Sequence, residues 1–157
     1  MIPDFISYPG CLWPLLPPGI HDSDMNEIYS KFVYNQRRKD LFDGFKRGLD
    51  NIFLSGCPQV FLDGSYVTEK PFPNDYEVCW DPRFVDPDKL DSVFFVLDNH
   101  RQAQKQIYMG EYFPSILVEG STGKPFLEFF QKDKATGNPK GIIRIKNYLL
   151  KGGIYDN

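Results

Sequence analysis

The sequence contains few of the residues that build disulfides, thiolate metal sites or membrane spans. Only three of its 157 residues are cysteines, and no two of them have C-x-x-C spacing. An odd number of cysteines without that spacing argues against a disulfide framework and a zinc site, and favours a reducing compartment, so we expect the cytoplasm. The apolar opening, 1–19, contains five prolines and lacks a basic leader, so we expect neither a membrane helix nor a signal peptide.

Concentrated positive charge and histidine are also scarce. The formal net charge is −3 and the calculated pI is about 5.3. The one basic triplet, 37–39, lies in a helical pattern, and a solvated helix face is the preferred interpretation over a nucleic-acid patch. Two isolated histidines give no basis for a Ser-His-Asp or Cys-His arrangement.

Apolar residues, in contrast, are abundant enough to fill a core. Hydrophobic residues make up 41% of the chain and aromatic residues 16%, which argues against disorder. The length predicts a single domain, 1–157, with the proline-rich segment 1–19 as an extended arm laid over the core.

The periodicity of the apolar residues predicts two helices near the start. Asp24 with Glu27 forms a capping-box pattern that begins the first helix. A second helix is predicted over 35–54, where apolar residues recur at steps of three and four. Gly44 and Gly48 lower its helix propensity, so we expect another element to approach them closely.

Helices and strands mix in the rest of the chain. The segment 88–108 is predicted to be helical in parts. Short apolar runs bounded by turn residues predict strands or strand-like elements at 59–62, 76–80, 113–119 and 142–145, and a further short element at 126–130. This order of elements predicts an α/β (α+β) fold, a small mixed sheet flanked by helices.

Two acids inside an apolar run are the main candidate for chemistry. Asp75 and Glu77 are two residues apart, so in a strand they project from the same face and repel each other. A divalent cation, Mg²⁺ or Mn²⁺, would relieve that repulsion, because Mg²⁺ binds one or two carboxylates together with substrate phosphates. Gly64 and Ser65 end the preceding strand, where a glycine lets a ligand approach and a hydroxyl with turn amides can hold a phosphate.

These residues carry a resemblance to a known superfamily. Gly64-Ser65, nine residues, then acid-apolar-acid-apolar at 75–78 resembles the signature of the DNA polymerase β-like nucleotidyltransferases. The chain is similar to a group of small bacterial and prophage proteins with a nucleotidyltransferase-like domain, in the stretches LPPGIH (16–21), FLDGSYVTEKPFPNDYEVCWD (61–81), NHRQAQK (99–105) and FLEFFQKDKATGNPKGI (126–142).

The resemblance implies a function and roles for particular residues. Asp75 and Glu77 would bind the metal, and Gly64 and Ser65 would grip the phosphates of a nucleoside triphosphate. The superfamily uses a third carboxylate on a later strand; Glu119, at the end of the predicted strand 113–119, is the candidate, while the apolar residue at 116 occupies the position where relatives would carry the acid.

Basic residues that could reach a triphosphate are Lys70, Arg101, Lys105 and Lys140. A surface role is preferred for each. The position of Lys70 within the motif makes it the strongest candidate of the four for binding phosphate.

Two functions stay open from the sequence. One is a nucleotidyltransferase that acts on an unknown hydroxyl acceptor. The other is a binding module with the same fold and a weakened site, an antitoxin or regulatory partner of a protein in a prophage or defence locus. The missing clear third acid favours the module, and the intact Gly-Ser and acid pairs favour the enzyme.

Overall fold

The fold is built on a five-stranded mixed sheet, seen in a computed structural model in which residues 1–150 are described. The strand order is β1-β5-β2-β3-β4, with β1 parallel to β5, β3 parallel to β4 and the other pairs antiparallel. The strands are β1 (Ile20–Asp22), β2 (Gln59–Asp63), β3 (Tyr76–Trp80), β4 (Gly110–Pro114) and β5 (Ile142–Lys146). The predicted mixed sheet with flanking helices is confirmed, and the predicted strands 59–62 and 76–80 are present and pair with each other.

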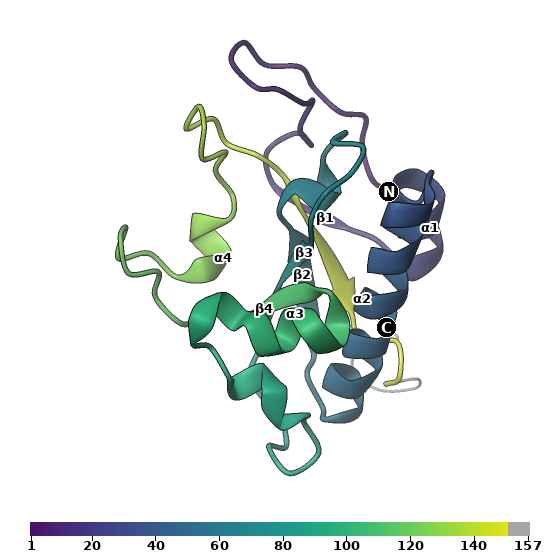
Figure 1. The fold of residues 1–157 in the computed structure, drawn as a ribbon, viewed down its shortest axis with the longest axis vertical. Coiled ribbons are helices and arrows are strands. Elements are labelled where there is room, and N and C mark those ends of the chain that lie inside the picture. Colours follow the sequence, from purple (N-terminus) through teal and green to yellow (C-terminus); the bar gives the residue numbers. More distant parts are fainter. Residues whose placement is uncertain (151–157) are drawn as a thin grey trace.

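Helices cover the two faces of the sheet unequally (Figure 1). They are α1 (Met25–Phe32), α2 (Gln36–Leu54), α3 (Gln102–Tyr108) and α4 (Phe126–Phe129). Three 3₁₀ turns accompany them, Ser65–Val67, Ser92–Phe95 and Asn99–Arg101. None of the helices in the described residues 1–150 is long and apolar enough to cross a membrane.

The first two helices begin where the sequence predicts. The Asp24 side chain accepts a hydrogen bond from the Glu27 amide at 2.8 Å, and the Asn35 side chain accepts one from the Arg38 amide at 2.9 Å. Such caps satisfy amides that have no partner within the helix.

Strand alternation divides the core into two clusters. Val60, Leu62 and Val78 face the large cluster under α1 and α2. Phe61 and Cys79 face the other side, where a smaller cluster includes Phe113 of β4 and Phe130 after α4. The short α4 therefore covers only part of this second face, and polar side chains of β2, β3 and β4 can share it.

The predicted strand 113–119 is wrong in its bounds. Strand β4 is Gly110–Pro114, and the amide of Leu117 donates to the carbonyl of Pro114 in a turn. Ile116 and Val118 are 68% and 57% exposed, so the apolar run that suggested a strand is largely in solvent. The strand lies three residues earlier because its pairing with β3 begins at Gly110.

The prediction that the basic triplet 37–39 lies on a solvated helix face is wrong for Arg38, which is fully buried. Its guanidinium donates hydrogen bonds to the carbonyls of Phe32 (3.2 Å), Tyr66 (2.8 Å), Thr68 (2.8 Å) and Lys70 (2.5 Å). Carbonyl oxygens replace water around the charge, which offsets much of the cost of burying it. Arg38 thereby fixes the loop that follows β2 against α2.

Glycines in α2 permit close contact with α3 and β4, as the sequence predicts. A Cβ atom at Gly44 would lie 2.2 Å from the carbonyl oxygen of Tyr108, and one at Gly48 would lie 2.1 Å from the hydroxyl oxygen of Tyr112. Both distances are far below van der Waals contact, so a larger residue requires the elements to separate.

We predict that Gly44→Ala destabilises the protein although alanine favours helix by about 1 kcal/mol. Overpacking against backbone should outweigh that gain and give a net loss of at least about 1 kcal/mol in the free energy of unfolding. Urea denaturation measures it. Gly120→Ala is the control, because its Cβ would meet nothing within 4 Å; equal stabilities of the two variants would contradict the close approach.

Candidate functional site

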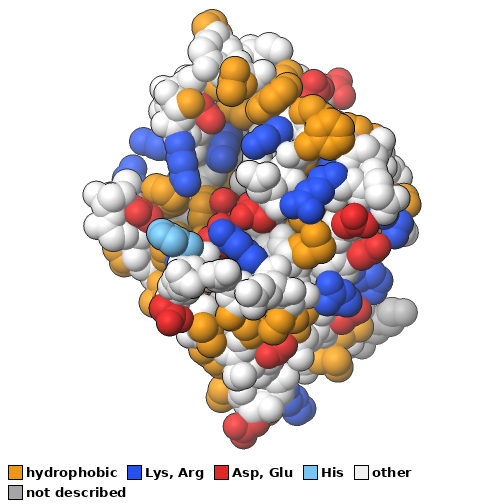
Figure 2. All heavy atoms as spheres, viewed as in Figure 1, with side chains coloured by type: hydrophobic (Ala, Val, Ile, Leu, Met, Phe, Trp, Pro, Cys, Tyr) orange, Lys and Arg blue, Asp and Glu red, His pale blue; other side chains and the backbone are white. Residues whose placement is uncertain are grey.

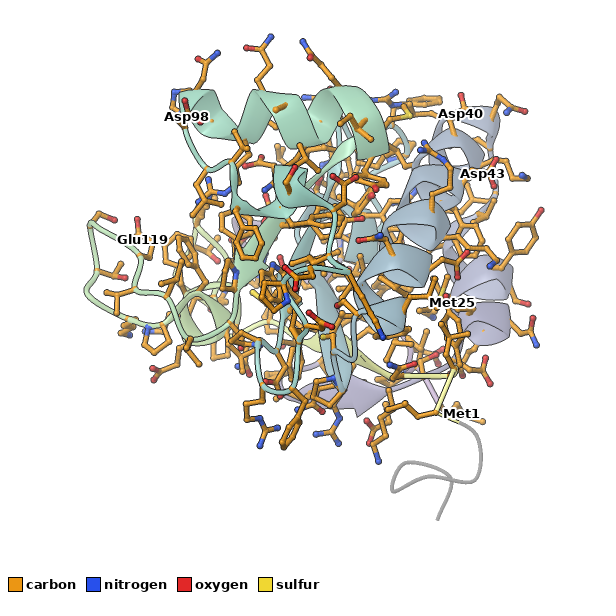
Figure 3. All side chains as sticks on the ribbon, turned by 90° about the horizontal axis from the view of Figure 1, so that it is seen from below. Met1, Met25, Asp40, Asp43, Asp98 and Glu119 are labelled. Carbon is orange, nitrogen blue, oxygen red and sulfur yellow. The ribbon has the colours of Figure 1, made fainter. Side chains whose placement is uncertain are left out.

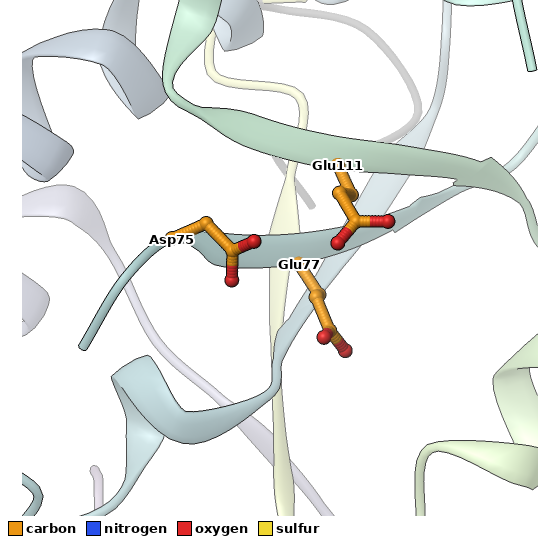
Figure 4. Close-up of side chains that lie close together, drawn as sticks. All are labelled: Asp75, Glu77 and Glu111. Atoms are coloured by element: carbon orange, nitrogen blue, oxygen red, sulfur yellow. The ribbon is translucent and has the colours of Figure 1, made fainter. Parts of the chain in front are cut away.

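Three carboxylates meet on the partly covered face of the sheet (Figure 4). Asp75 directly precedes β3, Glu77 lies within β3, and Glu111 lies in β4 opposite Glu77 in the parallel register. One oxygen from each of the three carboxylates lies within 4.8 Å of the others. The structure thus brings the predicted pair together and adds a third acid that the sequence analysis did not identify.

Contacts on the opposite face of the sheet fix the positions of these acids. Tyr76 and Tyr112 are fully buried, and their hydroxyl oxygens lie 2.6 Å apart in a hydrogen bond. The Tyr76 hydroxyl also lies 2.8 Å from the Tyr108 carbonyl oxygen. Because side chains alternate along a strand, anchoring these tyrosines toward α2 directs Glu77 and Glu111 to the other side.

Asp63, at the end of β2, adds a fourth carboxyl group beside Glu77, its partner in the antiparallel register. Asp63 is fully buried, and neither of its oxygens has a hydrogen-bond partner in residues 1–150. Burial, and then the charge of Glu77, raise the pKa of Asp63 well above its usual value. The neutral, protonated form of Asp63 is therefore favoured.

Two cations, one from α3 and one from the turn before it, approach the acids. The Lys105 ammonium lies 3.3 Å from a Glu111 oxygen and 3.8 Å from an Asp75 oxygen. The Arg101 guanidinium lies 3.7 Å from Glu111 and packs over the Phe113 ring at 3.8 Å. Arg101 is therefore not the solvated surface residue preferred from the sequence, and Lys105, although partly exposed, also contacts the acid cluster.

Burial and neighbouring negative charge shift the pKa values of the carboxyl groups in the cluster. Burial, together with the charges of Glu77 and Glu111, raises the pKa of Asp75 to about 6, and Lys105 only partly opposes this shift. Burial likewise raises the pKa of Glu77, against the opposing charge of Lys140. Such shifts are expected where carboxylates crowd together in a partly buried site.

The Gly64-Ser65 pair lies directly beside this cluster. Gly64 has a φ of +82°, and a Cβ there would lie 3.1 Å from the carboxyl carbon of Glu77, so only glycine fits without strain. Gly64, Ser65 and Glu77 line one cavity of about 290 Å³. The residues predicted to bind phosphate and one of the predicted metal ligands therefore line the same cavity.

The structure does not bring Lys70 or Glu119 into the cluster. Lys70 is not among the described residues that line the cavity, and its carbonyl accepts the hydrogen bond from Arg38. Glu119 lies at the outer edge of the molecule (Figure 3). Its carboxylate accepts hydrogen bonds from the Ser121 hydroxyl and the Thr122 amide, both at 2.7 Å, and these bonds lower its pKa to about 2.

The sequence signal for Glu111 was its place in the run Gly-Glu-Tyr-Phe-Pro, which combines a polar residue with buried aromatic ones. The prediction that Glu119 ends a strand beside the acid pair is wrong, because β4 ends at Pro114 and the chain then turns away. Asp63 could have been recognised as an acid inside a buried apolar run, directly before Gly64-Ser65.

Comparison with known proteins places the chain in a family but gives no function. A model described as "Family of unknown function (DUF6932)" matches residues 12–146. This match covers most of the chain, and the chain belongs to that family. No curated protein and no solved structure is similar enough to the chain to count as a match.

We predict that Asp75→Asn makes the metal-free protein more stable than wild type at pH 7. Asp75 titrates near pH 6 in the folded protein and near its usual value of 3.8 when unfolded, so the folded state holds the extra proton between these values. The free energy of unfolding of wild type should therefore fall as the pH rises from about 4 to about 6, a loss that the asparagine variant avoids.

Chemical denaturation at pH 4 and pH 7, with a chelator present, measures this difference. The advantage of Asp75→Asn should shrink toward pH 4, where protonation removes the buried charge of Asp75 and its repulsion by Glu77 and Glu111. Asp88→Asn, at an exposed position, is the matched control. An Asp75→Asn protein less stable than wild type at pH 7 would show that ion pairing with Lys105 outweighs the repulsion.

Proposed function

We propose that this member of the DUF6932 family is a nucleotidyltransferase that depends on Mg²⁺ or Mn²⁺ and transfers a nucleotidyl group from a nucleoside triphosphate to a hydroxyl acceptor. The observation that carries the proposal is the meeting of Asp75, Glu77 and Glu111 on one sheet face, next to Gly64-Ser65. The resemblance of the sequence motif to nucleotidyltransferases supplies the reaction type.

The acid cluster has the chemistry of a site for a hard divalent cation. Mg²⁺ and Mn²⁺ prefer oxygen ligands, and Mg²⁺ typically takes one or two carboxylates along with phosphate oxygens and water. Burial first, and neighbouring carboxylates second, raise the pKa values of Asp75 and Glu77. These shifts support the assignment, because a bound cation would offset both costs of the charged forms. The positive charges of Lys105 and Arg101 neutralise only part of the negative charge of the acid cluster.

Each residue has a role in this proposal. Asp75 and Glu77 would hold the cation, which would neutralise charge on the phosphates when bound. Glu111 would take the part first assigned to Glu119, as a third ligand whose carboxylate also receives the proton of the acceptor. The amides and hydroxyl at Gly64-Ser65 bind phosphate oxygens.

The reaction would be an in-line displacement at the α-phosphorus. The acceptor oxygen forms a bond to that phosphorus while the bond to the β-phosphate oxygen breaks, and pyrophosphate leaves. The acceptor proton passes to the carboxylate of Glu111. Positioning and electrostatic stabilisation then carry most of the rate enhancement.

The alternative, a binding module that has lost its activity, drew its support from the missing third acid. Glu111 stands opposite Glu77 in the register of β3 and β4, so that argument loses its basis. We therefore favour the enzyme and keep the module as an outcome of the experiments.

Metal binding is the first test. Isothermal titration of Mn²⁺ into the protein with a non-hydrolysable nucleoside triphosphate should give a Kd at least about tenfold weaker for Glu111→Gln than for wild type, a loss of about 1.4 kcal/mol or more. Glu119→Gln should bind like wild type, because Glu119 lies on an exposed loop. Equal binding by all three proteins would place the metal elsewhere.

Activity is the second test. Incubation with each labelled ribonucleoside triphosphate, Mg²⁺ and a cell extract should transfer label to an acceptor. Glu111→Gln should lower the rate by at least about 100-fold, as removal of one electrostatic group in such sites does. Glu119→Gln should stay within about threefold, a barrier change below about 1 kcal/mol. No label from any nucleotide, with a stable complex formed by a neighbour-encoded protein, would favour the binding module.

A further inference from the structure

A basic hairpin borders the cavity that Glu77, Gly64 and Ser65 line. Lys132, Lys134 and Lys140 line the same cavity, so three ammonium-bearing side chains and one acid of the metal cluster share it. On the face shown in Figure 2, basic side chains surround a hollow with acidic side chains at its floor.

The backbone of the hairpin sets the positions of these lysines. Lys132 pairs with Pro139 in an antiparallel bridge, and the Lys140 amide donates to the Gln131 carbonyl at 2.9 Å. The Asp133 amide in turn donates to the carbonyl of Asn138 at 2.8 Å. A closed hairpin therefore presents the lysines from two adjacent arms.

The nearest acid of the hairpin is already engaged. Asp133 accepts hydrogen bonds from the amide and the hydroxyl of Thr136, at 3.0 and 2.7 Å. In the described part of the chain, none of Lys132, Lys134 and Lys140 forms an ion pair with a carboxylate; Lys134 instead lies 5.6 Å from the centre of the Phe129 ring. Three ammonium groups thus border one cavity without a direct ion pair, while the charges of Lys140 and Lys134 act on Glu77 across it.

The N-terminal arm forms another wall of the cavity. The Cys11 sulfur lies 3.5 Å from an Asp133 oxygen and joins the arm to the hairpin. Trp13, which is 38% exposed, lines the cavity beside it. The cavity is therefore bounded by four separate segments, the strand end at Gly64, β3 at Glu77, the arm and the hairpin.

We propose that Lys132, Lys134 and Lys140 bind the β- and γ-phosphates of the nucleoside triphosphate, with the α-phosphate held near Glu77. This inference rests on the proposed function and adds the residues that select a triphosphate donor. Lysine binds phosphate as a point charge, and charge-assisted bonds of this kind are among the stronger ones in proteins. A chain of phosphates is the ligand that spans a metal cluster at one end and several ammonium groups at the other.

The probe is inorganic tripolyphosphate, titrated calorimetrically into the full chain with a chelator present so that the metal plays no part. Wild type should bind it, and the triple variant Lys132→Gln/Lys134→Gln/Lys140→Gln should bind at least about tenfold more weakly. Lys140→Arg, which keeps the charge, should retain most of the affinity that Lys140→Gln loses. Thermal melting checks that the variants fold.

The control is Lys46→Gln/Lys89→Gln/Lys124→Gln, which changes the net charge equally at lysines outside the cavity. It should bind tripolyphosphate within about twofold of wild type. Equal weakening by both triple variants would mean attraction by net charge alone and would overturn the proposal, as would unchanged binding by the hairpin variant.

Different experiments can refute the proposed metal site and the proposed phosphate-binding lysines. The metal site fails if Glu111→Gln binds Mn²⁺ as wild type does, a result that involves none of the three lysines. The lysine assignment fails if tripolyphosphate binding is insensitive to Lys132, Lys134 and Lys140, whatever the metal result.

Discussion

Repulsion between carboxylates on one face of the sheet is the constraint on which the functional account depends. Asp75, Glu77 and Glu111 lie within one metal-sized space, and Asp63 beside them is fully buried without a hydrogen-bond partner in residues 1–150. A fold optimised only for stability would not collect these groups, because each buried charge is costly unless it is paired. Lys105 and Arg101 supply only part of the compensation.

The rest of the structure holds this unfavourable arrangement in place. On the opposite face, the hydrogen bond between Tyr76 and Tyr112 and the close approach of α2 at Gly44 and Gly48 lock β3 and β4 against the helix layer. Arg38 fixes the loop after Gly64-Ser65 through the backbone carbonyls of Tyr66, Thr68 and Lys70. Stability taken from the large core thus offsets strain at the site, as is common where function requires crowded charges.

Local sequence patterns predict those parts of the structure that depend on residues close to each other in the sequence. The helical period of the apolar residues predicts α2 to within one residue at its start, and strand alternation predicts that Asp75 and Glu77 share one face. Contacts between distant segments lie beyond such patterns. Glu111 joins the site only through the parallel pairing of β3 with β4, and Arg38 is buried only because carbonyls from a distant loop surround it. The exposed apolar run 116–118 misled the assignment of the strand that carries the third acid.

The most direct test of the central claim is the position of a bound cation. Crystals of the wild-type protein grown or soaked with Mn²⁺ and a non-hydrolysable nucleoside triphosphate give an anomalous difference map that locates manganese without assumptions about ligands. The account predicts a peak on the order of 2 Å from carboxylate oxygens of Asp75, Glu77 and Glu111, the coordination distance typical of such ions. No peak there at saturating Mn²⁺, or a peak held by other residues, would contradict it.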